Sequence, residues 1–191
     1  LNNNIKVIHF VAPQVWIWRE SRVKKLKSFI DHILLLFPFE KKYFDKENIK
    51  STFIGHPLLE KNTENKENND QLKNDKKKII SIFPGSRLSE INILTPILLN
   101  FVKIMNKKYK DLFYVFHSTK LHFGKIQKLI LNHRLDNCSV VFDSNAKYQI
   151  LKSSIFAVAK SGTVSLEICK AQVPSVIIYK MNLINFLIIK M

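Results

Sequence analysis

Cysteine, glycine-rich motifs and metal-ligand motifs are scarce in this sequence, and each absence argues against a class of protein. Only Cys138 and Cys169 occur, without a CxxC pair, so we expect buried thiols in a reducing compartment rather than a disulfide scaffold. The six histidines show no HxxxH or HExxH spacing, so no metal site is expected. Neither GxGxxG nor GxxxxGKS/T is present, which disfavours a dinucleotide-binding fold and a P-loop NTPase.

Acidic residues are also in the minority. Lys and Arg number 31 against 15 Asp and Glu, which gives a formal net charge of +16. This charge predicts attraction to polyanions such as nucleic acid, an anionic membrane face or phosphorylated substrates, and it does not choose among them. Many of the lysines are scattered beside Asn and Ile, so a generic solvated surface is the plainer alternative.

The apolar run at the C-terminus is too short and too polar to cross a bilayer. The C-terminal run, VIIYKMNLINFLIIKM at 176–191, has 16 residues and is interrupted by Lys180, Asn182, Asn185 and Lys190. It is either a buried strand followed by a helix or an interfacial patch of a peripheral enzyme that binds an anionic inner leaflet. The N-terminus, LNNNIKVIHF, shows no signal-peptide pattern and enters a strand at once, so the sequence is expected to start in mid-domain.

Apolar strands and helical segments alternate along the chain in two series. Strands are predicted at 5–11, 32–37 and 51–54, and then at 79–83, 112–117, 139–142, 155–159 and 175–179. This alternation predicts an α/β fold with parallel sheets. Residues 60–77 are rich in Asn and Lys, so we place a linker or surface insert there, between domains at 1–59 and 78–191. Thr95 and Pro96 are expected to open a helix.

Two loops of the second series carry chemistry suited to phosphate. Both follow a strand and precede a helix, so both lie at the same edge of a parallel sheet. In Gly85-Ser86-Arg87, glycine lets the backbone approach a ligand, the amides that open the next helix form an anion site, and arginine presents a planar charged fork. Ser161-Gly162-Thr163 adds two hydroxyls to backbone amides at a helix start.

A carboxylate follows the second loop at a position that suits a sugar. Glu167 lies one turn inside the helix, four residues after Thr163, where it can accept two hydroxyl hydrogen bonds from a ribose. Together the loops and this residue predict a nucleotide-diphosphate site. The plainer alternatives are a βα turn with a solvated arginine and a Thr163 N-cap.

A segment near the N-terminus, QVWIWRESR, places two tryptophans beside two arginines, Arg19 and Arg22. Either Trp16 and Trp18 pack on the sheet while the cations are solvated, or the segment lines a cleft that faces an anionic or amphipathic substrate.

Four stretches, taken in order and spacing, resemble the lipid-A-disaccharide synthase family. They are APQVWIWRESRVKKL at 12–26, LLLFPFEKKYF with FIGHPLLE at 34–44 and 53–60, FPGSRLSEI at 83–91, and KSGTVSLE at 160–167. The WxWR and PGSRxxEI elements are quite specific. The resemblance implies a GT-B glycosyltransferase, in which two Rossmann-like domains with parallel sheets face a cleft and the N-terminal one is incomplete here.

The resemblance also implies a reaction and a location. The family transfers 2,3-diacylglucosamine from UDP-2,3-diacylglucosamine to 2,3-diacylglucosamine 1-phosphate (lipid X), with inversion, and releases UDP and lipid A disaccharide 1-phosphate. It uses no essential metal, and no cofactor is expected. The implied location is cytoplasmic, peripheral to the anionic cytoplasmic face of the bacterial inner membrane.

Residue roles carry over by position from the same resemblance. The residues that would bind UDP are Gly85, Ser86, Arg87, Ser161, Gly162, Thr163 and Glu167. Among them, Arg87 would stabilise charge on the departing UDP and Glu167 would face the uridine ribose, while Glu90 would order the first loop. The acceptor-side residues would be Trp16, Trp18 and Arg19.

Several family features fall outside this sequence or differ from it. The Gly-rich opening loop and the Asp that serves as the proposed general base precede the equivalent of Leu1, and a tail that returns to the N-terminal domain would follow Met191. Glu60 stands where the family usually has Asp. The chain is therefore expected to be a partial form of such an enzyme.

Three alternatives stay open. One is another UDP-sugar GT-B transferase, although the WxWR segment lies on the acceptor side, where such families diverge. A second is a basic, non-catalytic nucleic-acid-binding protein. Because the aromatic residues cluster in strands and in a Trp pair rather than along a basic face, no nucleic-acid partner is expected. A third is a decayed fragment without a stable fold, because an incomplete half-sheet would expose apolar edges.

Overall fold

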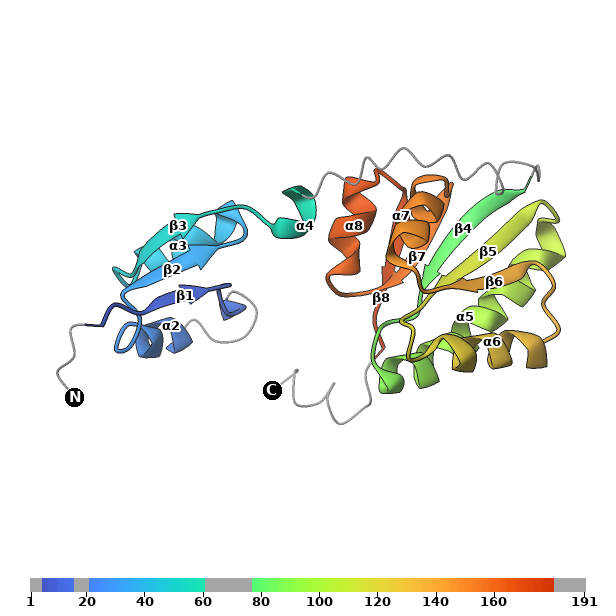
Figure 1. The fold of residues 1–191 in the computed structure, drawn as a ribbon, viewed down its shortest axis with the longest axis horizontal. Helices are drawn as coiled ribbons and strands as arrows, with labels where there is room; N and C mark the ends of the chain where they lie inside the picture. The colour runs from blue at the N-terminus through green and yellow to red at the C-terminus, as the bar shows by residue number, and fades with distance from the viewer. Residues whose placement is uncertain (1–4, 16–20, 61–76, 181–191) are drawn as a thin grey trace. The chain divides into compact units, whose positions relative to one another are not determined.

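The computed structural model describes residues 5–15, 21–60 and 77–180. The chain divides into two compact units, Leu1–Asn62 and Thr63–Met191 (Figure 1). Each unit has its own parallel sheet and its own apolar core.

The first unit holds a three-stranded parallel sheet in the order β1-β2-β3. Its elements are β1 (Ile8–Phe10), α2 (Ser21–Leu26), β2 (His32–Leu35), the 3-10 helix η1 (Pro38–Glu40), α3 (Lys41–Asp45), β3 (Lys50–Phe53) and α4 (Pro57–Glu60). Ile33 and Leu35 on the central strand pack in a buried cluster with Val23 and Phe44. The three predicted strands are present. β1 is shorter than predicted at both ends, and at its C-terminal end Val11 has a left-handed backbone, with φ at 72°.

Glutamate side chains contact the backbone of two loops of this unit. The Glu40 side chain is buried and accepts hydrogen bonds from the amides of Leu36 and Phe37, at 3.0 and 2.9 Å. After β3, Gly55 has φ at 84°, and a Cβ added there would lie 2.6 Å from Oε1 of Glu60. Glu60, which stands in place of an Asp in the family pattern, therefore lies directly against the loop after β3.

The second unit holds a five-stranded parallel sheet in the order β6-β5-β4-β7-β8. Its elements are β4 (Lys78–Phe83), α5 (Leu88–Lys108), β5 (Leu112–His117), α6 (Phe123–Asn132), β6 (Cys138–Val141), α7 (Ser144–Lys152), β7 (Phe156–Lys160), α8 (Val164–Lys170) and β8 (Ser175–Ile178). The chain first moves outward from β4 through β5 to β6, and then returns to build β7 and β8 on the other side. This is the predicted doubly wound α/β arrangement, and its switch point lies between β4 and β7.

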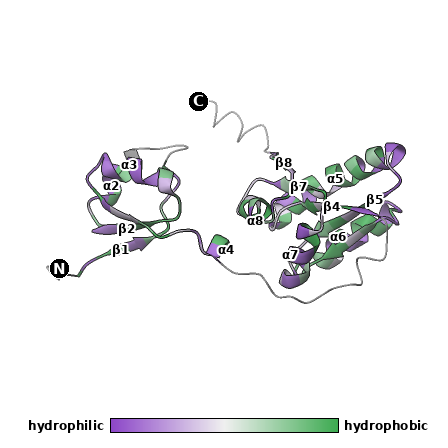
Figure 2. Ribbon diagram, turned by 90° about the horizontal axis from the view of Figure 1, so that it is seen from above, coloured by the Kyte–Doolittle hydropathy of each residue, from purple (hydrophilic) through white to green (hydrophobic). Residues whose placement is uncertain are grey.

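Alternate side chains of each strand pack on opposite layers. Ile80 and Ile82 of β4 join a core with α5 and α6, whereas Ile79 packs with Ile150 of α7. Phe83 packs with Ile168 of α8. Helices α5 and α6 therefore cover one face of the sheet and α7 and α8 the other (Figure 1). Along α5 and α6, hydrophobic and hydrophilic residues alternate as in helices with one buried face (Figure 2).

Helix α5 runs unbroken from Leu88 to Lys108, so the prediction that Thr95 and Pro96 open a new helix is wrong. Proline inside a helix removes one backbone hydrogen bond. Here a buried face that includes Ile91, Leu94 and Leu98 packs on the sheet and offsets that loss. By length and composition, α5 is the one helix among the described residues that could cross a membrane, and its buried face belongs to the apolar core of the second unit.

The two cysteines differ in exposure. Burial raises the pKa of Cys138, on β6, to about 12. Cys169 is exposed, so the expectation of two buried thiols is wrong for this residue. The reason is that α8 packs on the sheet through Ile168, which turns the next residue toward solvent.

A buried polar network joins β4, β5 and the end of α7. Ser81 Oγ lies 2.9 Å from His117 Nε2 and 2.8 Å from Ser154 Oγ, and the Ser154 hydroxyl donates to the Ile150 carbonyl at 2.8 Å. Burial, with a smaller effect from the charge of Lys147, lowers the pKa of His117 from 6.5 to about 3. The imidazole is therefore neutral at physiological pH.

His117 should make the stability of the second unit depend on pH. An imidazole in the unfolded chain takes up a proton near pH 6.5, but His117 in the folded chain does so only near pH 3. Between these values the unfolded state binds more protons, so stability falls as the pH is lowered. From pH 7 to pH 5 the free energy of unfolding should fall by about 2 kcal/mol.

Urea unfolding of the chain measures this loss. Circular dichroism is the suitable signal, because both tryptophans lie in the first unit. His117→Gln is the control, since its amide N–H can still reach Ser81 while it cannot titrate. The same pH dependence in both proteins would show that His117 is not its source.

Candidate functional site

A cavity of about 320 Å³ lies at the carboxyl edge of the second sheet, beside the switch point between β4 and β7. The loops after these two strands line it, where ligands of doubly wound folds bind. Eight residues predicted from the sequence line the cavity: Gly85, Ser86, Arg87, Glu90, Ser161, Gly162, Thr163 and Glu167. The structure thus brings together residues from two segments that are about 75 positions apart in the chain.

Gly85 has the backbone conformation that the loop after β4 requires. Its φ is 112°, a region that other residues rarely adopt. A Cβ added there would also lie 2.8 Å from the Cβ of Glu90 and still closer to its carboxylate. Both the backbone angle and the close approach of Glu90 therefore require glycine at this position.

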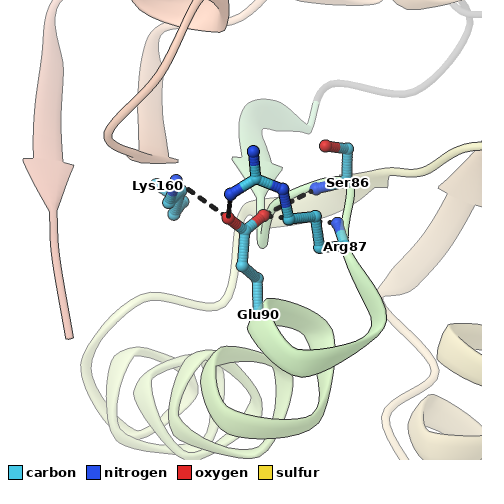
Figure 3. A network of polar contacts seen from close by, with 4 residues as sticks. All are labelled: Ser86, Arg87, Glu90 and Lys160. Carbon is cyan, nitrogen blue, oxygen red and sulfur yellow. Dashed lines mark hydrogen bonds and ion pairs between the residues drawn. The ribbon is translucent and has the colours of Figure 1, made fainter. Parts of the chain in front are cut away.

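Glu90 holds the loop after β4 through its carboxylate (Figure 3). Oε2 accepts hydrogen bonds from the amides of Ser86 and Arg87, at 3.1 and 3.3 Å. Burial alone would raise the pKa of Glu90, but the hydrogen bonds from Lys160, Arg87 and Ser86 outweigh it and hold the pKa below 4.5. Two of the amides that were expected to face an anion are thus bound by Glu90 itself, which has the loop-ordering position that the sequence suggested.

Lys160 connects the two loops across the switch point. This last residue of β7 places Nζ 2.9 Å from Oε1 of Glu90, and both side chains are largely buried, at 21% and 16% exposed. Sequence reasoning missed this role. The sequence feature that could have revealed it is a lysine at the carboxyl end of an apolar strand, directly before Ser161-Gly162-Thr163.

The Arg87 guanidinium, in contrast, is loosely held. Its Nη1 lies 3.7 Å from Oε1 of Glu90, too far for a hydrogen bond, and the side chain is 80% exposed. Glu90 therefore fixes the backbone of Arg87 and leaves the charged fork able to turn toward an anion in the cavity.

The loop after β7 lines the cavity through Ser161, Gly162 and Thr163. The Ser161 amide donates to the Ile178 carbonyl of β8 at 2.9 Å, so it is not available to a phosphate. The Thr163 side chain makes no capping hydrogen bond, although the residue precedes α8, and the Ser165 hydroxyl donates to the Gly162 carbonyl at 2.7 Å. Ser161 and Thr163 both line the cavity, with Glu167 one turn further on.

A third wall of the cavity was not predicted. It consists of His117, Ser118 and Thr119 at the end of β5 and of Lys147 on α7. The first three had a signal in the sequence, because polar residues at the carboxyl end of an apolar strand belong to the same edge as the two loops. Lys147 had none, since only the packing of α7 brings its side chain to the cavity.

The predicted acceptor-side residues Trp16, Trp18 and Arg19 lie outside the described residues. Within 5–15, 21–60 and 77–180, no group of three or more His, Cys, Asp or Glu side chains is placed to hold a metal ion. The cavity combines cations, hydroxyls and two carboxylates, a set that suits an anionic ligand with hydroxyl groups.

Solved structures show the fold class. A Staphylococcus aureus MnaA–UDP structure matches with a TM-score of 0.61 at 18% identity, over 80% of this chain and 43% of that one. The UDP-GlcNAc 2-epimerase of Methanocaldococcus jannaschii, in complex with UDP-GlcNAc and UDP, matches with a TM-score of 0.55 at 13% identity, over 90% and 59%. At these identities the likeness concerns the fold alone. It confirms the predicted α/β fold of the GT-B type.

Closer relatives are found among curated sequences. The lipid-A-disaccharide synthase of Coxiella burnetii (strain Dugway 5J108-111) is 36% identical over 192 residues, which cover 95% of this chain and 48% of that protein. The lipid-A-disaccharide synthase of Wigglesworthia glossinidia brevipalpis is 35% identical, over 98% of this chain and 50% of its own length. The chain thus spans about half the length of these relatives.

The family comparison covers the whole sequence. The family model described as lipid-A-disaccharide synthetase matches residues 1–191, including both loops that line the cavity. Because this match is complete and the relatives agree with it, the chain belongs to the lipid-A-disaccharide synthetase family.

Proposed function

We propose that this chain provides the UDP-sugar-binding part of an inverting glycosyltransferase of lipid A biosynthesis. The reaction transfers 2,3-diacylglucosamine from UDP-2,3-diacylglucosamine to the 6-hydroxyl of lipid X and releases UDP. The observation that best supports this function is the joining of the loops after β4 and β7 by the Lys160–Glu90 ion pair, beside one cavity, in a chain of this family.

The charges around the cavity suit a diphosphate leaving group. Its cations are Arg87, Lys147 and Lys160, and its carboxylates are Glu90 and Glu167. Because Glu90 already neutralises Lys160, the excess positive charge is on Arg87 and Lys147. As the bond between the sugar and the phosphate breaks, negative charge grows on UDP, and an exposed guanidinium can bind that charge without first breaking a strong contact.

The remaining residues suit hydrogen bonds to the phosphates and to the ribose of the donor. Ser161 and Thr163 would donate their hydroxyls to phosphate oxygens, and Glu167, which lines the same cavity, would accept hydrogen bonds from ribose hydroxyls. In this proposal 78–191 is the UDP-sugar domain and 60–77 a linker. Residues 1–59 belong to the acceptor-side domain, where Trp16, Trp18 and Arg19 would contact lipid X.

Replacement of Arg87 tests the proposed site. Calorimetry should show UDP binding to the chain, and Arg87→Ala should weaken it about 10- to 100-fold, because a charged hydrogen-bond donor to the diphosphate is lost. Lys128→Ala is the control, since Lys128 is an exposed cation on α6 that does not line the cavity. Equal affinity of the Arg87→Ala protein and the parent chain would contradict the assignment.

A double-mutant cycle tests whether the Lys160–Glu90 pair assembles the site. Glu90→Gln and Lys160→Met should each cost about 3 kcal/mol of stability, because each leaves a largely buried charge unpaired. Each should also weaken UDP binding, whereas the double variant should lose little more than either single one.

The pair Lys78–Asp111 is a matched control. It has the same 2.9 Å separation and involves the other end of β4, but its side chains are 60% and 48% exposed. Lys78→Met and Asp111→Asn should change neither stability nor UDP affinity measurably. Additive losses for Glu90 and Lys160 would show that the two residues act independently.

We further propose that the chain contacts the anionic surface of the inner membrane, where acylated substrates reside. The net charge of +16 supports this proposal. The chain should sediment with phosphatidylglycerol vesicles at low salt and much less at about 1 M salt, where charges are screened within about 3 Å. Vesicles of phosphatidylcholine are the control. Failure to sediment with anionic vesicles at low salt would argue against membrane contact.

A further inference from the structure

His117 forms part of the cavity wall with a buried nitrogen that has no partner. The residue is 2% exposed, and its ring stacks on Phe83 with the centroids 4.1 Å apart. Among the residues that the structure describes, nothing hydrogen-bonds to His117 Nδ1, and the same is true of Thr119 Oγ1, two residues further along the same wall. Buried polar atoms without partners are rare and costly, so two that line one cavity point to a ligand.

The hydrogen bonds on the other side of the ring determine which nitrogen carries the proton. A carbonyl can only accept, so the Ser154 hydroxyl donates its single proton to Ile150. Ser154 must then accept from Ser81, which uses the single proton of Ser81. Ser81 can therefore only accept from His117, so Nε2 carries the imidazole proton.

Nδ1 is therefore unprotonated, and its lone pair can only accept a hydrogen bond. Burial keeps the ring neutral, so Nδ1 does not become a donor at physiological pH. The wall around it is also fixed before any ligand arrives. The Ser118 amide donates to the Val141 carbonyl of β6 at 2.8 Å, and its hydroxyl donates to the Thr119 carbonyl at 3.0 Å.

We propose that His117 Nδ1 and Thr119 Oγ1 form a specificity subsite that binds an N–H or O–H donor of the nucleotide sugar. Thr119 can donate to an acceptor next to that donor, so the pair matches a group in which a donor and an acceptor are adjacent. The uracil N3–H beside a ring carbonyl has this pattern, and so does a pair of neighbouring hydroxyls on the ribose or on the transferred sugar. This inference rests on the proposed function, since it names further residues of the same UDP-sugar site.

Two substitutions of His117 distinguish the role of Nε2 from the role of Nδ1 in ligand binding. His117→Gln retains an amide N–H that can reach Ser81 but has no atom at the Nδ1 position. His117→Asn places an oxygen acceptor near the Nδ1 position but cannot reach Ser81. In calorimetry, His117→Gln should bind UDP-GlcNAc about 5- to 10-fold more weakly than the parent chain does, and His117→Asn should recover most of the loss. Thr119→Val should also weaken binding, and Thr119→Ser should not.

Ligand analogues identify the donor. If it is the uracil N–H, N3-methyl-UDP should bind the parent chain as weakly as UDP binds His117→Gln. If it is a ribose hydroxyl, 2′-deoxy-UDP or 3′-deoxy-UDP should do so instead. If it belongs to the transferred sugar, His117→Gln should lose affinity for UDP-GlcNAc and not for UDP.

A measurement on the unaltered chain does not depend on the variants folding. In ¹⁵N NMR spectra of the histidine side chains, addition of UDP or UDP-GlcNAc should move the Nδ1 resonance of His117 and leave Nε2 protonated. If neither ligand moves this resonance, or if His117→Gln binds both as tightly as the parent chain, the inference is overturned while the proposed function stands. A parent chain that binds neither ligand refutes the proposed function and the inference together.

Discussion

The Glu90 carboxylate binds three groups that lie on both sides of the switch point. The geometry of the cavity depends on these contacts. Two of the groups are the amides of Ser86 and Arg87, in the loop after β4, and the third is Lys160 at the end of β7. A carboxylate in such a position replaces the ligand anion that could otherwise satisfy those amides. The loops are therefore positioned in the ligand-free chain, and the exposed Arg87 side chain is left as the adaptable part of the site.

The same physical solution recurs in the first unit. Glu40 accepts from the two amides that follow β2, and Glu60 lies against Gly55 after β3. In each case an acidic side chain that follows the strand within a few residues satisfies or covers the backbone of the loop. A loop closed in this way is held by the residues that directly follow it in the chain.

Much of the fold could be predicted because it depends on local pattern. The runs at 79–83 and 112–117 are β-branched and aromatic, and they form β4 and β5 within one residue of the predicted ends. That both loops lie at the same edge of the sheet could be predicted from the order of strands and helices along the chain alone. The helix after Arg87 was predicted, but the second helix start at Thr95 and Pro96 was wrong, since local capping signals were outweighed by the buried face of one longer helix. The tautomer of His117 and the contact between Lys160 and Glu90 could not be predicted, because each depends on atoms that come together only when neighbouring strands pair.

The contact between Gly85 and Glu90 constrains how this loop can change over evolution. A residue with a Cβ at position 85 would collide with the Glu90 side chain and would also require an unfavourable backbone angle. A shorter residue at position 90 would remove the contact with the carboxylate, but its own Cβ would still collide and the backbone angle would still be unfavourable. A change at Gly85 therefore needs the whole turn to be rebuilt, whichever residue stands at position 90. A homologue without this glycine should differ in loop length or path, and not merely in one side chain.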